Sequence, residues 1–255
     1  MKIIGIIASR YASTRFPAKA LADIYGKPMF WWVYQNSKQS KKLTKLYIAT
    51  DDIRISSVCE QFNIPYIMTD VKHATAANRL YEASCSMSAD YYVQINGDEP
   101  IIDSKLIDSV IPNDIPQNKE FGTNLVCEMT SPAEVNDPTN IKVIFNNNFD
   151  TIYMSRAPIP YPYKTISYKY YKHIGIIGYN KKMLDLYGNS NPGITEAIEG
   201  VDTLRFIDYR KEFKSVVVEN VNSISIDTPK DLEYALKIIK NKLDNKELEH
   251  IKELL

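Results

Sequence analysis

The sequence has few cysteines and glycines and no excess charge of either sign. Its 255 residues include 3 cysteines and 9 glycines, and 31 basic side chains balance 31 acidic ones. An odd number of widely spaced cysteines argues against a disulfide framework and indicates reduced, intracellular thiols. A net charge of zero provides no overall basic field for nucleic acid or anionic lipid, although it does not exclude a local basic pocket.

Long hydrophobic runs are also missing. The apolar run at 3–8 is too short for the core of a signal peptide and leads straight into a loop with arginines. No segment approaches the roughly 18 consecutive apolar residues of a membrane span. With 44% hydrophobic and 24% charged residues, the composition is that of a globular protein. We therefore expect a cytoplasmic protein that binds neither membranes nor nucleic acid.

The short motifs of several enzyme classes are absent. No HxH, HExxH or CxxC pair occurs, which argues against a zinc site. No GxSxG sequence supports a Ser-His-Asp hydrolase. Neither a Walker A loop nor a GxGxxG sequence is present, so any nucleotide phosphates must be held in another way.

The first part of the chain alternates between apolar runs and amphipathic segments. We expect strands at 2–8, 45–50, 65–68 and 91–95, and helices at 28–39, 53–62, 75–87 and 104–111. This alternation is typical of an α/β fold with a mostly parallel sheet and helices on both faces. Ligands bind at the carboxyl ends of such strands, which directs attention to the loops at 9–19, 50–52 and 96–100.

The pattern changes after about residue 121. Strands are expected at 123–129, 142–146, 151–154 and 168–179, with little helix between them, and again at 215–219. We interpret 121–180 as a mixed-strand insertion and a candidate oligomer surface within a single domain spanning 1–255. Apolar spacing predicts a packed helix at 231–243, and the charged tail beyond it is expected to fray.

The loop at 8–19 gathers three cations and three hydroxyl groups at the end of a predicted strand. The cations are Arg10, Arg15 and Lys19, and the hydroxyl groups belong to Ser9, Ser13 and Thr14. Arginine offers paired donors to phosphate and lysine offers a point charge, so the loop suits a polyphosphate. The alternative is a solvated basic loop. Only seven of the 31 basic residues are arginines, which favours a specific site.

Two further loops carry carboxylates. Asp98 and Glu99 follow the apolar strand YYVQI in the sequence NGDEP, where they could hold Mg²⁺ or simply form a turn. Asp227 precedes Pro229 in SIDTPKDL, where it could be a second metal ligand or part of a helix cap. His173, in KHIGIIGY, could be a hydrogen-bonded core residue, or could contact an anion together with Lys172.

Taken together, these segments resemble one protein family. The sequences SRYASTR followed by Lys19, GKPM, ATDD, GDEP, SRAPIP, HIGIIGY and IDTPKDLE occur in this order between residue 2 and about 240. This combination is similar to that of the CMP-Kdo synthetase family, the 3-deoxy-manno-octulosonate (Kdo) cytidylyltransferases. The resemblance implies a Rossmann-like nucleotidyltransferase fold and a homodimer that forms through the region containing SRAPIP.

The resemblance also implies an activity: Mg²⁺-dependent transfer of CMP from CTP to an acidic keto sugar, with release of pyrophosphate. The product would serve lipopolysaccharide or capsule synthesis. Arg10 and Lys19 would act on the triphosphate, and Asp98 and Asp227 would hold Mg²⁺. The implied nucleotide-binding residues are Ser9, Arg10, Ser13, Thr14, Arg15, Lys19, Thr75, Arg79 and Asn96. The implied acceptor-binding residues are Lys172, His173, Tyr179 and Glu199.

The chain departs from the family pattern in the base and acceptor half. The segment Thr75–Arg79 is TAANR, where the family has a hydroxyl, a glycine and a carboxylate before the arginine. Asn96 replaces a glutamine, Ala18 a glycine and Lys172 an arginine. An acceptor other than Kdo is therefore an open alternative, such as another keto-deoxy sugar acid, a phosphonate or a phosphorylated metabolite. A nucleotide-binding protein that has lost catalysis is another.

Overall fold

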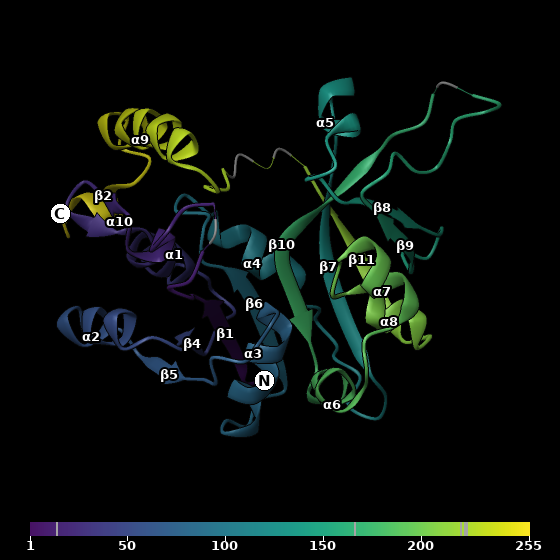
Figure 1. Cartoon of the computed structure of the whole chain (residues 1–255), viewed down its shortest axis with the longest axis horizontal. Coiled ribbons are helices and arrows are strands. Elements are labelled where there is room, and N and C mark those ends of the chain that lie inside the picture. The colour runs from purple at the N-terminus through teal and green to yellow at the C-terminus, as the bar shows by residue number, and fades with distance from the viewer. Residues whose placement is uncertain (14, 166, 220, 222–223) are drawn as a thin grey trace.

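A computed structural model describes residues 1–13, 15–165, 167–219, 221 and 224–255. Within this part of the chain, nine strands form one sheet, whose main path runs β11-β7-β10-β6-β1-β4-β5. The strands of this path are β1 (Ile3–Ala8), β4 (Lys45–Thr50), β5 (Tyr66–Met68), β6 (Tyr91–Asn96), β7 (Phe121–Glu128), β10 (Tyr171–Tyr179) and β11 (Glu212–Val218). Figure 1 shows the N-terminal strands in one half of the molecule and β7 to β11 in the other.

The sheet is mostly parallel, as predicted. The pairs β1–β4, β1–β6, β4–β5 and β11–β7 are parallel, whereas β10 lies antiparallel between β6 and β7. The hairpin of β8 (Lys142–Phe145) and β9 (Thr151–Ser155) joins the sheet through β10. A separate small hairpin is formed by β2 (Asp23–Ile24) and β3 (Lys27–Pro28). The mixed-strand region after residue 121 is therefore confirmed.

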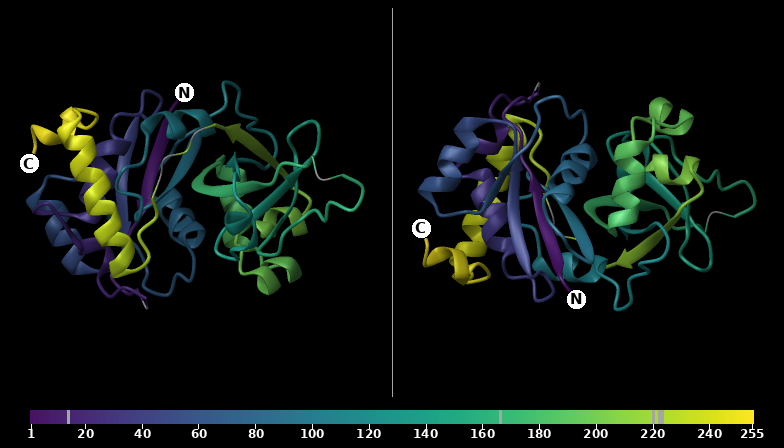
Figure 2. Two further views of the ribbon diagram at one scale, coloured as in Figure 1. Left: turned by 90° about the horizontal axis from the view of Figure 1, so that it is seen from above. Right: turned by 90° about the horizontal axis from the view of Figure 1, so that it is seen from below.

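Helices cover both faces of the sheet, which also confirms the prediction. The first face carries α1 (Met29–Ser37), α2 (Ile53–Gln61), α4 (Ser104–Val110), α9 (Pro229–Asp244) and α10 (Glu249–Lys252). The second face carries α3 (Ala76–Cys85), α6 (Lys181–Asn189) and α8 (Leu204–Asp208). Two short helices, α5 (Pro132–Asn136) and α7 (Ile194–Glu199), lie in the second half. Figure 2 shows yellow α9 beside the N-terminal strands and the green helices at the opposite end.

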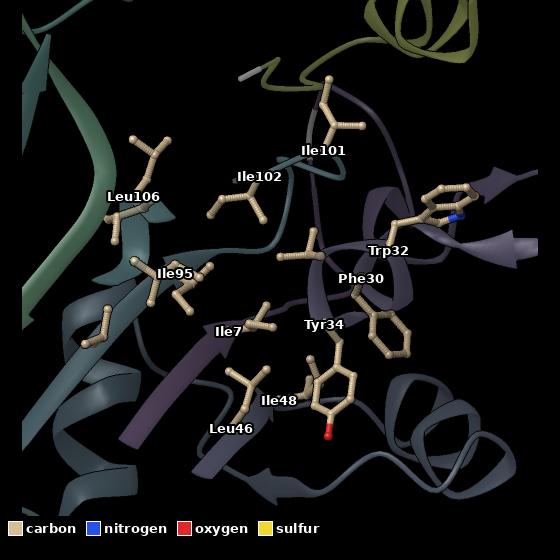
Figure 3. Packing of buried hydrophobic residues seen from close by; sticks show 14 of the residues in the cluster. Ile7, Phe30, Trp32, Tyr34, Leu46, Ile48, Ile95, Ile101, Ile102 and Leu106 are labelled. Carbon is tan, nitrogen blue, oxygen red and sulfur yellow. The ribbon is translucent and has the colours of Figure 1, made fainter. Parts of the chain in front are cut away.

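Alternating side chains place aliphatic residues on each face of the strands. On the first face, Ile7, Ile48 and Ile95 come from three neighbouring strands; Ile48 lies near Tyr34 of α1, and Ile95 lies on the side of Ile102 and Leu106 (Figure 3). Burial of such side chains contributes about 25 cal/mol per Å² of apolar surface, so this packing fixes the strands whose ends carry the polar loops.

The chain beyond Asp244 differs from the expectation that it frays. It forms α10, whose Ile251 is fully buried against the first core cluster. His250 Nε2 lies 2.9 Å from Asn36 Oδ1 of α1, which adds a polar contact to the apolar one. Although most side chains of this segment are charged or polar, the helix has one apolar side, and that side packs against the core. In the described part of the chain, no helix combines the length and apolar character needed to cross a membrane.

Candidate active site

A polar cavity of about 310 Å³ lies at the carboxyl ends of β1 and β6. It brings together almost all of the predicted nucleotide and metal residues. Those that line it are Ser9, Arg10, Ser13, Arg15, Lys19, Thr75, Arg79, Asn96, Asp98 and Asp227. Thr14 lies outside the described residues. Because β1 and β6 are adjacent and parallel, their following loops meet at one edge of the sheet.

The two loops approach each other closely at Gly97. A Cβ atom at this position would lie 2.8 Å from both Ala8 O and Ser9 Oγ, so only glycine fits without a shift. The buried Ser9 Oγ has no hydrogen-bond partner among the described residues. Gly97 thus lets the loop at 96–100 lie directly beside the loop at 9–19.

The loop at 8–19 is restrained by Arg54, which was not among the predicted site residues. The Arg54 guanidinium lies over the Tyr11 ring, and its central carbon, Cζ, is 3.3 Å from the ring centroid. Asp52 Oδ1 accepts a 2.8 Å hydrogen bond from Arg54 Nε. Cation–π stacking of this kind restrains the loop without adding a charge to the cavity.

Lys19 joins the two predicted metal ligands. Its Nζ donates to Asp98 Oδ2 at 2.6 Å and to Asp227 Oδ1 at 3.1 Å. Arg15 donates to the same Asp227 oxygen at 3.0 Å. The backbone N–H of Ile226 bonds to the Asp98 carbonyl oxygen at 2.9 Å, which holds the two distant segments side by side. Two carboxylates and two cations therefore form one cluster at the cavity wall.

Arg79 reaches the cavity from α3 and is almost completely buried, with 3% of its surface exposed. Its Nη2 donates to Asp51 Oδ2 at 2.7 Å, and its Nη1 donates to Thr69 Oγ1. Asp51 follows β4 in the ATDD segment and belongs to the loop at 50–52, which the sequence also indicated as a candidate site loop. This ion pair could not be predicted from the sequence, because the two residues are 28 positions apart.

Thr75 caps α3 at the cavity. Its Oγ1 accepts a 3.1 Å hydrogen bond from Asn78 N and lies 3.0 Å from Tyr187 Oη, which reaches across from α6. Arg205 stacks on the Tyr187 ring at 3.8 Å and forms a buried ion pair with Glu196 at 2.7 Å. The TAANR segment, the main departure from the family pattern, is therefore held by the second half of the molecule.

The predicted acceptor residues lie outside the lining of this cavity. Lys172 Nζ donates to Glu134 at 2.8 Å, and His173 Nδ1 contacts Asn124 Oδ1. Tyr179 is fully buried, with its ring centroid 5.5 Å from that of Phe206.

Glu199 is occupied by the SRAPIP segment, since its oxygens accept from the Ser155 hydroxyl at 2.6 Å and Arg156 N at 2.9 Å. The acceptor roles of Lys172, His173, Tyr179 and Glu199 stay predictions.

β10 nevertheless borders the cavity. It runs antiparallel to β6, so its first half lies beside the carboxyl end of β6, where Asn96 lines the cavity. A Cβ atom at Gly175 would lie 2.0 Å from Asn96 Nδ2, so this glycine provides the space for the Asn96 amide. His173 precedes Gly175 by two residues on β10, and Gly175 packs against Asn96, which lines the cavity.

Comparison with known proteins agrees with this geometry. A family model described as cytidylyltransferase matches residues 4–251. The chain belongs to the cytidylyltransferase family. In keeping with this, the arrangement of strands and helices is that of a nucleotidyltransferase.

Several relatives of this cytidylyltransferase are known. A protein of Shewanella woodyi, 8-amino-3,8-dideoxy-manno-octulosonate cytidylyltransferase, is 36% identical over 236 residues, covering 91% of this chain and 96% of the relative. A protein of the same name from Shewanella loihica is 35% identical, with the same coverage of both chains.

A solved structure, CMP:2-keto-3-deoxy-manno-octonic acid synthetase complexed with CTP, superposes with a TM-score of 0.89. It is 31% identical and covers 95% of this chain and 100% of its own. The inositol-1-phosphate CTP transferase of T. maritima covers 91% of this chain and 94% of its own. At a TM-score of 0.65 and 14% identity, it shows the shared fold alone.

Asp98 and Asp227 of this cytidylyltransferase fit a magnesium ion. Asp98 Oδ1 is buried and has no hydrogen-bond partner among the described residues, so one carboxylate oxygen is available. Within the same residues, no group of three or more His, Cys, Asp or Glu side chains could hold a metal. A site with only two protein carboxylates suits Mg²⁺, which usually takes one or two carboxylates together with phosphate oxygens and water.

One polar residue of the cavity, His73, was not predicted from the sequence. The Nε2 atom of His73 contacts Glu82 of α3. It is one of only 3 histidines and stands two residues before the TAANR segment. The small number of histidines and the position of His73 beside this segment are the two signals from which it could have been predicted as a site residue.

We expect Tyr187→Phe to weaken CTP binding about fivefold, because it removes the hydroxyl that lies beside the Thr75 cap, and a net hydrogen bond contributes about 1 kcal/mol. Titration calorimetry with CTP measures this. The matched control is Tyr91→Phe, which removes another buried hydroxyl, 2.8 Å from Thr123 and outside the cavity lining. Equal CTP affinities in the two variants would contradict the role of Tyr187.

We expect His173 to make the fold sensitive to acid. Burial lowers the pKa of His173 to about 4, from an ordinary value of 6.5. Between these values the unfolded chain holds the extra proton, so stability falls as the pH falls from 6.5 towards 4. The expected loss by pH 4.5 is about 2 kcal/mol in the free energy of unfolding. Urea unfolding of wild type and His173→Asn at several pH values would measure it, and identical pH slopes would contradict it.

Proposed function

We propose that the chain transfers CMP from CTP to Kdo or a closely related eight-carbon sugar acid, releasing pyrophosphate. The observation that carries this proposal is the cluster of Lys19, Asp98 and Asp227 in one polar cavity with Arg10 and Arg15. Cations for a triphosphate and carboxylates for a metal are thereby placed side by side. The names of the relatives support the substrates, because they act on Kdo or its 8-amino form, and one was solved with CTP.

The chemistry needs placement and charge neutralisation more than covalent help from the protein. The acceptor hydroxyl oxygen attacks the α-phosphorus of CTP and its proton passes to solvent, while the bond from that phosphorus to the bridging oxygen breaks and pyrophosphate leaves. Arg10 and Lys19 would offset the negative charge on the departing pyrophosphate. Asp98 and Asp227 would hold Mg²⁺, which when bound neutralises phosphate charge and orients the reacting oxygens. No side-chain nucleophile is required.

The acceptor would approach from the side of β10. Lys172, His173, Tyr179 and Glu199 are the residues that the family resemblance offers for this part of the site. One contact motivates the alternative of an acceptor other than Kdo: the Lys172 ammonium is already bound to Glu134 at 2.8 Å. A lysine that is already paired with a glutamate binds a sugar carboxylate less strongly than the planar guanidinium of an arginine, which can donate two hydrogen bonds.

The test is pyrophosphate release from CTP and Mg²⁺ with a panel of acceptors. The panel contains Kdo, its 8-amino-3,8-dideoxy analogue, other keto-deoxy sugar acids, a phosphonate and a phosphorylated sugar. UTP in place of CTP and a reaction without acceptor are the controls. Turnover with Kdo or its 8-amino analogue supports the proposal, and turnover with another class alone supports the alternative acceptor. CTP binding without turnover on any acceptor would overturn the proposal and indicate lost catalysis.

We further propose that the chain forms a homodimer through the region at 121–180. An apolar cavity of about 610 Å³ lies there, lined by Met129, Pro132, Val135, Pro158, Tyr161 and Tyr170, among others. Tyr161 and Tyr163 are 82% and 86% exposed on the segment between β9 and β10, which extends away from the body of the protein (Figure 1). Exposed apolar patches of this kind mark interaction surfaces.

Light scattering after size exclusion tests the dimer. We expect the wild type to have the mass of two chains and the Tyr161→Ser/Tyr163→Ser variant to have the mass of one. A monomeric wild type at micromolar concentration would contradict the proposal. Tyr234→Ser, a change at a tyrosine of α9 that is also exposed, is the control.

A further inference from the structure

The cluster of Lys19, Arg15, Asp98 and Asp227 has two layers. Lys19 is the inner cation, with 18% of its side chain exposed, and it contacts both carboxylates. Arg15 is the outer cation, with 61% of its side chain exposed, and it contacts Asp227 alone. The formal charges of the four side chains sum to zero. The protein's own cations therefore balance the charge of the two carboxylates, while Asp98 Oδ1 keeps no hydrogen-bond partner among the described residues.

The inner position is the one that a metal ion would need. An ion held by Asp98 and Asp227 together would lie between their oxygens, and the Lys19 ammonium already contacts an oxygen of each. A divalent ion entering alone would displace the ammonium and leave it close by without a counter-ion. Like charges a few ångströms apart in a partly buried site repel each other strongly.

A triphosphate changes this balance. It supplies several anionic oxygens within the same cavity, which Arg10, Arg15 and Lys19 all line. Lys19 and Arg15 can then exchange a carboxylate for a phosphate, and the two aspartates become available. Each cation keeps an anionic partner throughout this exchange.

We propose that Lys19 excludes Mg²⁺ from the free enzyme, and that the triphosphate of CTP ends this exclusion by taking Lys19 from Asp98 and Asp227. Metal then binds together with the nucleotide and not before it. The inference rests on the proposed function, because it assigns the triphosphate to Lys19 and the metal to the two aspartates. It adds that Lys19 determines the order in which these ligands bind.

The test measures metal binding without nucleotide, with Mn²⁺ as the probe. Electron paramagnetic resonance reports free Mn²⁺, and thermal unfolding reports stabilisation by the bound ion. We expect the Lys19→Met variant to bind Mn²⁺ at least about tenfold more tightly than the wild type, since one adjacent positive charge is removed. We also expect Mn²⁺ to raise the melting temperature of Lys19→Met and to leave that of the wild type unchanged.

Two variants serve as controls. Lys119→Met removes another lysine that forms an ion pair, with Glu212, away from the cavity lining, and it should bind Mn²⁺ as the wild type does. Lys19→Met/Asp98→Asn should lose the tight binding, which would place the ion at Asp98. If Lys19→Met does not fold, Lys19→Gln replaces it, and in the wild type CTP should increase Mn²⁺ binding beyond the binding by CTP alone.

The outcomes separate this inference from the proposed function. Equally tight Mn²⁺ binding by the wild type and Lys19→Met overturns the inference, even if the enzyme turns over. Absence of Mn²⁺ binding to Lys19→Met overturns it as well, and also removes the metal site from the proposed function. Lack of turnover on every acceptor, with the expected Mn²⁺ result, would overturn the proposed transfer alone.

Discussion

Asp98→Asn is expected to lower the rate of CTP-dependent pyrophosphate release by about a thousandfold, because a bound metal contributes several kcal/mol of charge stabilisation in the transition state. The amide keeps the shape of the side chain but loses the charge that would hold Mg²⁺. Folding should be unchanged, since Lys19 keeps its 3.1 Å bond to Asp227 and Ile226 N still bonds to the backbone oxygen of residue 98.

The measurement is initial velocity against Mg²⁺ concentration, together with the melting temperature. Asp114→Asn, a change at an exposed aspartate outside the cavity lining, serves as the control and should keep the wild-type rate. A variant with asparagine at 98 that keeps most of its activity would show that Asp98 is not a metal ligand.

Arg79→Met is expected to destabilise the fold by about 3–5 kcal/mol, the usual effect of removing one partner of a buried ion pair. Asp51 would keep its charge in a place where its side chain is only 11% exposed. For a chain of this size, the loss corresponds to a fall in melting temperature of roughly 10 °C. CTP affinity should fall as well, because Arg79 lines the cavity.

A double variant distinguishes these two effects. Arg79→Met/Asp51→Asn removes both charges, so much of the stability should return while CTP binding stays weak. Urea unfolding and titration calorimetry on the same samples measure the two quantities. Recovery of both would mean that Arg79 acts on stability alone, and recovery of neither would mean that the methionine disturbs the packing around α3.

Much of the fold could be predicted because each strand has a strong local pattern. The expected strand at 45–50 coincides with β4, and those at 2–8 and 91–95 differ from β1 and β6 by one residue at one end. The antiparallel position of β10 between β6 and β7 could not be predicted, because pairing depends on contacts between distant segments. The helices α6 to α8 were also missed. They are short, with nine, six and five residues, and Gly193 and Gly200 stand at the two ends of α7, so α7 and α8 are too brief for a clear helical pattern.

The site was predicted in part for the same reason. The loops after β1 and β6 could be placed together from the rule that parallel strands end at one edge. Asp227 lies 208 residues after Lys19, and only the family resemblance connected them before the structure did. The pair of Arg79 with Asp51 and the contact of Thr75 with Tyr187 depend on the folded arrangement of distant helices and loops. No local pattern carries that information.

The hydrogen bond between Ile226 and Asp98 has a consequence for the synthesis of the protein. A nascent chain on the ribosome acquires the loop at 8–19 early and the GDEP loop afterwards, but it lacks Asp227 until the chain has been extended far beyond both loops. Under the proposed function, a chain that stops before Asp227 would carry cations for a nucleotide but only one of the two carboxylates. We expect such truncated products to be unable to consume CTP.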